Sequence, residues 1–421
     1  MQPRERVARR WAASWRVAMV AITIGSMALA LRAPPAHAGL LLVGETMKPQ
    51  GVAVDPRTGV VYVGDSDGNI CRILSVNATG MPEVLAGGSG RCATSGDGGS
   101  AYSAEVEPGR RLAVDGSGNV YSSDGYALRR ISQATGRIAA WAGRAEWHCL
   151  EFSYGGPHPS VGAVAAEVGM YTSGVATDPV SGHLYVLDAC ARAIWEIDES
   201  GVVVARYGGF GTERSAYASS LAFDPEGNLY FSEGLYGQQI VKMDRRGAFT
   251  TIAGNGGTSN SGDGGPATRA ELHGVAGLAV DSRGNLYFAT TDSYIRVVTP
   301  EGTLYPIAGR SWLESVPSPP YPGGPVEQGK FAGIDDLAID AEDNLYVSDW
   351  LDSTLLTLQR PIEPRSTVGW ILHERVPRDA DGERRRRLDA HAAPARPLRL
   401  RQSRAPGQRA RPQRRDDDAQ L

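Results

Sequence analysis

The sequence predicts an all-β protein made of six copies of one four-stranded unit, arranged in a closed ring. Six times, a short apolar strand ends in Asp, passes through a tight turn and continues as a second strand that is usually built on a Leu-Tyr or Val-Tyr pair. One such unit cannot bury its own apolar faces, so neighbouring copies must pack together. The 52 Gly and 26 Pro among 421 residues suit many short strands joined by turns. The copies are GVAVDPRTGVVYV from Gly51, RLAVDGSGNVYS from Arg111, GVATDPVSGHLYV from Gly174, SLAFDPEGNLYF from Ser220, GLAVDSRGNLYF from Gly277 and DLAIDAEDNLYV from Asp336.

Each unit is predicted to contain four antiparallel strands, a to d. In the fifth unit they span residues 277–281, 285–291, 294–298 and 303–309. Gly284 and Gly302 lie in the two hairpin turns, where glycine adopts positive φ at little cost. Alternating apolar residues along each strand are expected to face the neighbouring units.

The last unit lacks a fourth strand at its own end of the chain. Five units end strand d in Gly, whereas the sixth runs through residues 354–358 to Pro361 without a comparable strand. Residues 40–44 have the form of a strand d. We predict that this N-terminal strand completes the sixth unit and closes the ring, which protects an open edge. The five glycines are Gly87, Gly143, Gly208, Gly254 and Gly309.

Residues 1–38 are predicted to be a signal peptide. Five arginines precede the apolar run at residues 17–31, and Ala36-His37-Ala38 has the small-x-small pattern of a cleavage site. The run is about 15 residues long, which is short for a bilayer span. We therefore expect a secreted protein, periplasmic or associated with the cell envelope, with no transmembrane segment.

Residues 39–362 are assigned to the ring and residues 363–421 to a disordered tail rich in Arg, Pro and Ala. Residues 39–360 contain 22 Lys and Arg against 37 Asp and Glu, whereas the residues that follow contain 15 Arg against 9 acids. The acidic ring would repel a phosphate backbone, so no nucleic-acid partner is expected.

The repeated L-A-V-D-x-x-G-N-L-Y-V core, the I-R-x-V of strand c and the connector GDGGPATRAEL from Gly262 resemble the NHL-repeat family. The connector is similar to those of extracellular bacterial NHL proteins and of teneurin-type NHL domains. The resemblance covers about residues 40–360 and implies a six-bladed β-propeller. Such propellers serve as binding platforms and, in fewer members, as lyases or hydrolases.

The Gly-Asp-Gly-Gly segments at residues 96–99 and 262–265 are expected to seal the gaps between units. We expect Pro266 to start a short helical turn that sends Leu272 into the core. Calcium or phosphate binding is the alternative interpretation. The segments follow a strand without opening a long helix, which argues against a phosphate cradle.

The residues just before each strand a are expected to surround the mouth of the central channel. Arginines, a histidine and carboxylates from different units would meet there and clamp a small polar or anionic ligand. The alternative is that these groups hold water and one another. The candidate ligand-binding residues are Arg110, Arg111, Tyr171, Tyr217, His273, Asp335 and Asp336.

No metal site and no cofactor are predicted, with calcium left open. The histidines are spread over different loops, whereas a metal site usually needs three or four converging ligands. The segment Asp65-Ser66-Asp67-Gly68 resembles part of a calcium loop but lacks the downstream carboxylate, so a turn is expected.

Four cysteines in a secreted chain predict disulfides. Three pairings are open, and the positions of the cysteines in the units favour two local bridges, Cys71 with Cys92 and Cys149 with Cys190. Each bridge would fix a long loop to its own unit.

The sequence thus favours a binding or interaction module, expected to be monomeric, that holds a protein, peptide or small polar ligand on its loop-rich face. The alternative is a propeller lyase or hydrolase with an active site at the channel mouth, where His273 and Asp335 are the candidate catalytic pair. The His-Glu-x-x-His and Cys-x-x-Cys motifs do not occur.

Overall fold

The structure is a computed structural model, and it describes residues 42–43, 48–77, 81–108, 111–124, 127–143, 159–189, 191–208, 220–234, 237–309, 331–359 and 371–372. The chain divides into two compact units, Met1–Val376 and Pro377–Leu421, and all described residues belong to the first. The predicted signal peptide and nearly all of the predicted tail lie outside the described residues.

Six antiparallel sheets, the blades, form this unit. Blade 1 contains β2 Pro49–Val54, β3 Val61–Ser66, β4 Cys71–Val76 and β5 Pro82–Ala86. Blade 2 contains β6 Leu112–Val114, β7 Val120–Ser123, β8 Ala127–Ile131 and β9 Ile138–Gly143. Blade 3 contains β10 Thr172–Thr177, β11 Leu184–Asp188, β12 Ala193–Ile197 and β13 Val203–Gly208.

The second half of the ring repeats this order. Blade 4 contains β14 Leu221–Phe223, β15 Leu229–Glu233, β16 Gln239–Met243 and β17 Phe249–Ala253. Blade 5 contains β18 Val275–Val280, β19 Leu286–Thr290, β20 Ile295–Val298 and β21 Leu304–Ala308. Blade 6 contains β22 Ile334–Ile339, β23 Leu345–Asp349 and β24 Thr354–Gln359. In the described parts of the connectors, η1 Ala165–Glu167 and η3 Ala267–Arg269 form 3₁₀ turns between blades.

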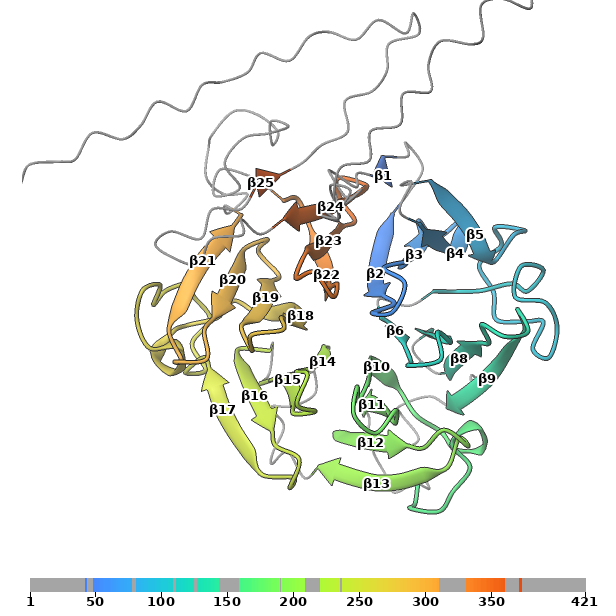
Figure 1. Ribbon diagram of the computed structural model, residues 1–421, viewed down its shortest axis with the longest axis horizontal. Helices are drawn as coiled ribbons and strands as arrows, with labels where there is room; N and C mark the ends of the chain where they lie inside the picture. The colour runs from blue at the N-terminus through green and yellow to red at the C-terminus, as the bar shows by residue number, and fades with distance from the viewer. Residues whose placement is uncertain are drawn as a thin grey trace, which may run out of the picture. The chain divides into compact units, whose positions relative to one another are not determined.

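The innermost strands, β2, β6, β10, β14, β18 and β22, form a ring around the axis. Each contacts the next along the chain, and β22 contacts β2, so the circle closes (Figure 1). Side chains between neighbouring blades form the core; Trp195 and Phe288 are among the largest that are fully buried. The predicted all-β ring of six four-stranded blades is confirmed, and the protein is a six-bladed β-propeller.

The sixth blade takes its outer strand from elsewhere in the chain, as predicted. β1 Leu42–Val43 pairs antiparallel with β24, with Leu42 opposite Leu355. A second short strand, β25 Ile371–Leu372, pairs with the far end of β24, with Leu372 opposite Leu358. The sequence did not predict β25, which lies in the range assigned to the tail. A segment that precedes the six repeats and a segment that follows them therefore both pair with β24.

The glycine that ends strand d has a steric cause. Gly309 has φ of +97°, and a Cβ placed there would lie 2.1 Å from the carbonyl oxygen of Ser293. That carbonyl belongs to the loop before β20 of the same blade. Only glycine lets the chain leave strand d so close to its neighbour.

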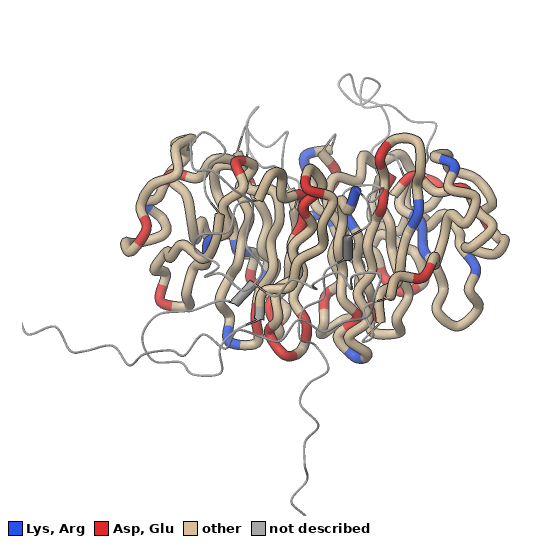
Figure 2. Tube along the Cα trace, turned by 90° about the horizontal axis from the view of Figure 1, so that it is seen from above, with Lys and Arg blue, Asp and Glu red and all other residues tan. Residues whose placement is uncertain are grey.

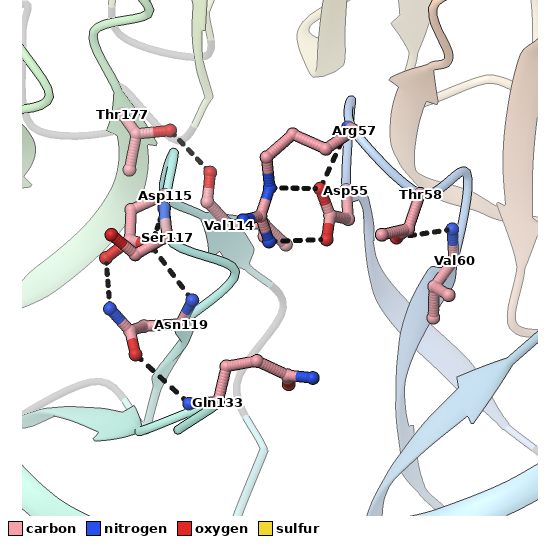
Figure 3. A network of polar contacts seen from close by, with 10 residues as sticks. All are labelled: Asp55, Arg57, Thr58, Val60, Val114, Asp115, Ser117, Asn119, Gln133 and Thr177. Atoms are coloured by element: carbon pink, nitrogen blue, oxygen red, sulfur yellow. Dashed lines mark hydrogen bonds and ion pairs between the residues drawn. The ribbon is translucent and has the colours of Figure 1, made fainter.

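The Asp of the repeat holds the turn between strands a and b together. In blade 2, the carboxylate of Asp115 accepts hydrogen bonds from the backbone and side-chain amides of Asn119 (2.9 and 2.7 Å) and from the hydroxyl of Tyr121 (3.0 Å). Figure 3 shows the contacts of Asp115 with Asn119 beside the Asp55–Arg57 pair of blade 1. Asp224, Asp281 and Asp340 repeat the Asp-Asn-Tyr arrangement in blades 4, 5 and 6. The recurring motif is therefore a structural lock.

The two ends of the ring differ in their loops. We call the end with the a–b and c–d turns the turn face, and the end with the b–c loops and d–a connectors the loop-rich face. The edge-on view shows charged residues at these two ends and on the strands between them (Figure 2). Acids at the end of strand b anchor the connectors on the loop-rich face: the carboxylate of Asp349 accepts from the backbone amides of Ala332 and Gly333, both at 2.9 Å. Asp65 and Asp188 accept in the same way from Lys48 and Tyr171.

Candidate functional site

The side chain of Arg111 reaches across the centre of the ring. It begins just before β6 in blade 2, and its guanidinium donates to the carbonyl oxygens of Ala276 in blade 5 and of Asp335 in blade 6, the latter at 3.0 Å. The same group lies 3.5 Å from the carboxylate of Asp336. Only 6% of Arg111 is exposed. Three blades are thus tied together at the axis by one side chain.

Asp336 is the buried partner of this arginine. Burial raises the pKa of its carboxyl group to about 7, although Arg111 and the backbone amides of Val52 and Leu337 act in the opposite direction. The neighbouring carboxylate of Asp335 raises the pKa further. Asp336 also accepts a hydrogen bond of 3.3 Å from the amide of Val52 in blade 1. The pair therefore joins blades on both sides of the point where the ring closes.

Other residues that were predicted to surround the channel mouth have partners other than Arg111 and Asp336. His273 is exposed, and its Nδ1 lies 3.2 Å from the hydroxyl of Thr291 in the b–c loop of its own blade. Tyr171 is partly buried, and its backbone amide donates to Asp188. Arg110 and Tyr217 lie outside the described residues. The structure brings together Arg111, Asp335 and Asp336 and places His273 in contact with a different loop.

Both members of the axial pair were among the predicted mouth residues, and a comparison of equivalent positions in the repeats singles them out. At the position four residues before the turn Asp, blades 1, 3 and 5 carry glycine and blade 4 carries Ser220. Arg111 and Asp336 are the two charged exceptions, and they contact each other. Gly277 allows the approach, because a Cβ there would lie 2.7 Å from the amide nitrogen of Leu337. Close packing of β18 on β22 brings the carbonyls of blades 5 and 6 within reach of one guanidinium.

The Gly-Asp-Gly-Gly connectors have the sealing role that was expected. In the connector into blade 5, the amide of Gly264 donates to the carbonyl of Leu304, and the amide of Leu304 donates to the carbonyl of Gly265. This adds a short extra pairing to the outer edge of β21. η3 begins directly after Pro266, and Leu272 is fully buried, as predicted.

The acid of each Gly-Asp-Gly-Gly segment pairs with an arginine of strand c in the following blade. The Arg129 guanidinium donates to Asp97 at 2.7 and 2.9 Å, and Arg129 is only 3% exposed. In blade 5, Nε of Arg296 lies 3.4 Å from the carboxylate of Asp263. The connector motif and the I-R-x-V motif are thus two halves of one ion pair.

One of the two expected disulfides lies within the described residues. Cys71 and Cys92 are bonded, and the bridge fixes the connector after blade 1 to strand β4. Cys149 and Cys190 lie outside the described residues, so their pairing stays a prediction.

The segment at residues 65–68 forms the turn that was expected. The carboxylate of Asp67 accepts hydrogen bonds from the backbone amides of Asn69 and Ile70, both at 2.7 Å, as in an ordinary turn.

Blade 3 replaces the Asp-Asn-Tyr lock with a different cluster that the sequence prediction did not find. Nδ1 of His183 lies 2.6 Å from one carboxylate oxygen of Glu196, and the hydroxyl of Tyr207 donates to the other at 2.6 Å. Burial is the main cause that raises the pKa of Tyr207 to about 12. The signal was His183 at a position where four other blades have Asn.

Within the described residues, no group of three or more His, Cys, Asp or Glu side chains is arranged to hold a metal ion. The same residues include no helix long and apolar enough to cross a membrane.

Comparisons with known proteins agree with the fold. No known protein-family profile matches the chain. Human teneurin-4 is 27% identical over 279 residues, covering 56% of this chain and 10% of teneurin-4. The chain thus spans about a tenth of the length of the curated relatives it matches.

Among solved structures, an auxiliary nutrient binding protein from Bacteroides thetaiotaomicron superimposes with a TM-score of 0.52 and 14% identity, over 73% of this chain and 68% of that chain. Its counterpart from Bacteroides ovatus gives 0.51 and 15%, over 74% and 69%. These likenesses concern the fold alone, and they agree with the β-propeller architecture.

Proposed function

We propose that the chain is a secreted or envelope-associated NHL-repeat propeller that binds a protein, peptide or small polar ligand through its loop-rich face. The observation that carries the proposal is the contrast between the two ends of the ring. On the turn face, four blades repeat one hydrogen-bonded Asp-Asn-Tyr lock. On the loop-rich face, the connectors differ in length and sequence from blade to blade. Binding residues in proteins concentrate where loops vary on a rigid scaffold.

The pairing of Arg111 with Asp336 at the ring axis supports a binding site on the loop-rich face and not inside the channel. Arg111 and Asp336 occupy the centre of the ring and use each other as partners. His273 and Tyr171 have other partners, namely Thr291 in a b–c loop and Asp188 at the end of β11, respectively. In this proposal they contact the ligand, while Arg111, Asp335 and Asp336 hold the blades that present them.

The assignment to the NHL family rests on the repeated motif and on the match to teneurin-4. The extracellular or envelope location is supported by the Cys71–Cys92 bridge, because disulfides persist mainly in oxidising compartments.

The test is binding of the purified, labelled chain to peptide and glycan arrays, followed by titration of the strongest probe. We expect His273→Ala and Tyr171→Ala to weaken that binding at least about tenfold, which corresponds to about 1.4 kcal/mol. Arg246→Ala is the matched control, because this exposed residue lies in a c–d turn on the opposite face. Equal binding by all three variants, or a loss confined to Arg246→Ala, would refute the loop-rich face as the binding surface.

A further inference from the structure

We propose that the ring axis is a cation site that the protein fills with the guanidinium of Arg111, and that a calcium ion takes this place once the side chain is removed. The proposal is independent of any ligand on the loop-rich face. It concerns the oxygens of blades 5 and 6 that converge on a group from blade 2.

The donor set is made of hard oxygen atoms. The backbone carbonyls of Ala276 and Asp335 and the carboxylate of Asp336 all face the guanidinium. Carbonyl and carboxylate oxygens, completed by water, are the ligands that calcium takes in proteins. Arginine offers the same oxygens a delocalised positive charge with several N–H donors.

The burial of the site favours a positive charge beside the ionised carboxylate of Asp336. Asp336 is 4% exposed and Arg111 is 6% exposed, so neither charge is well solvated by water. Removing one partner of a buried ion pair leaves an uncompensated charge, which is strongly destabilising.

The repeat provides an internal control. Six blades have the same strand a, yet a long cationic side chain occurs at this position in blade 2 alone, and a carboxylate occurs in blade 6 alone. The neutral residues at the equivalent positions are Gly51, Gly174, Ser220 and Gly277. These two exceptions lie 3.5 Å apart although they come from separate blades.

The experiment compares thermal unfolding of the full chain and its Arg111→Ala variant in CaCl₂ and in NaCl of equal ionic strength. In NaCl, we expect Arg111→Ala to melt at a lower temperature than the parent chain. CaCl₂, at a hundredfold excess over the Kd of the variant for calcium, should raise the unfolding midpoint of the variant by about 5 °C. The parent chain should show no such calcium effect. Arg111→Ala combined with Asp336→Asn should lose the calcium response, and Arg111→Lys should behave like the parent because it keeps a cation.

Calorimetric titration of Arg111→Ala with CaCl₂ should give one ion per chain. The proposal is overturned if calcium leaves the midpoint of Arg111→Ala unchanged, or if it raises that of the parent equally. If Arg111→Ala does not fold in NaCl, it is refolded from urea in CaCl₂. Recovery of the β-sheet circular dichroism spectrum in CaCl₂ alone supports the proposal, and failure in both salts overturns it.

Discussion

Replacing Asp336 with Asn should remove a defined part of the pH dependence of folding stability. Burial raises the pKa of this carboxyl group from its ordinary value of 3.8 to about 7 in the folded chain. Between these values the folded state holds a proton that the unfolded state releases, so the contribution is full below pH 3.8 and disappears as the pH rises through 7. From pH 5 to pH 8, a difference close to two pKa units gives a loss of about 2.5 kcal/mol.

The assay is urea unfolding followed by tryptophan fluorescence at pH 5, 6, 7 and 8 and constant ionic strength. The quantity of interest is the parent's unfolding free energy minus that of Asp336→Asn, because other titrating groups cancel in this difference. It should fall by about 2.5 kcal/mol from pH 5 to pH 8. Glu226→Gln, which alters an exposed acid on the turn face, should show no comparable trend. A difference that stays constant, or rises with pH, would refute the burial of a destabilised carboxylate at the axis.

Three further changes test the ring itself. Deleting residues 39–45 should open the sixth blade and sharply lower the melting temperature, because β1 pairs with β24; a variant that melts like the parent rules out this closure. Gly309→Ala should cost more than about 1 kcal/mol in urea unfolding, because its Cβ would strike a backbone carbonyl, whereas Gly302→Ala has similar φ but open space around it and should cost less. Equal costs would contradict the steric explanation. Replacing Cys71 and Cys92 with Ser should cost about 3 kcal/mol through the freed loop, and unchanged stability would show that the bridge contributes little.

The repeat made the ring predictable from sequence. Strand periodicity, turn glycines and the Asp of each a–b turn are local features, and each recurs in every blade or in most of them. Even the pairing of residues 42–43 with the sixth blade followed from counting strands, because one unit lacked its outer edge. β25 could not be predicted in this way, since two residues at 371–372 have no counterpart in the other blades.

The candidate site was predictable in part. Arg111, Asp335 and Asp336 were chosen for their position before strand a, and the structure shows them in contact. That these groups hold one another was one of the two interpretations left open, and the sequence could not decide between them because the contact depends on the distance across the ring and on the close packing allowed by Gly277. His273 was expected beside them, but its ring position is set by Thr291 in a loop of its own blade. The sequence prediction did not use the fact that Arg111 and Asp336 stand where the other four repeats carry Gly or Ser.

A double-mutant cycle on Arg111 and Asp336 at pH 8 tests most directly the claim that one ion pair locks the centre of the ring. Urea unfolding would be measured for the parent, Arg111→Met, Asp336→Asn and the double variant. Breaking a buried pair from one side typically costs about 3–5 kcal/mol, so we predict a coupling energy of at least about 2 kcal/mol between the two sites. Single-variant effects that add to within about 0.5 kcal/mol would contradict the lock.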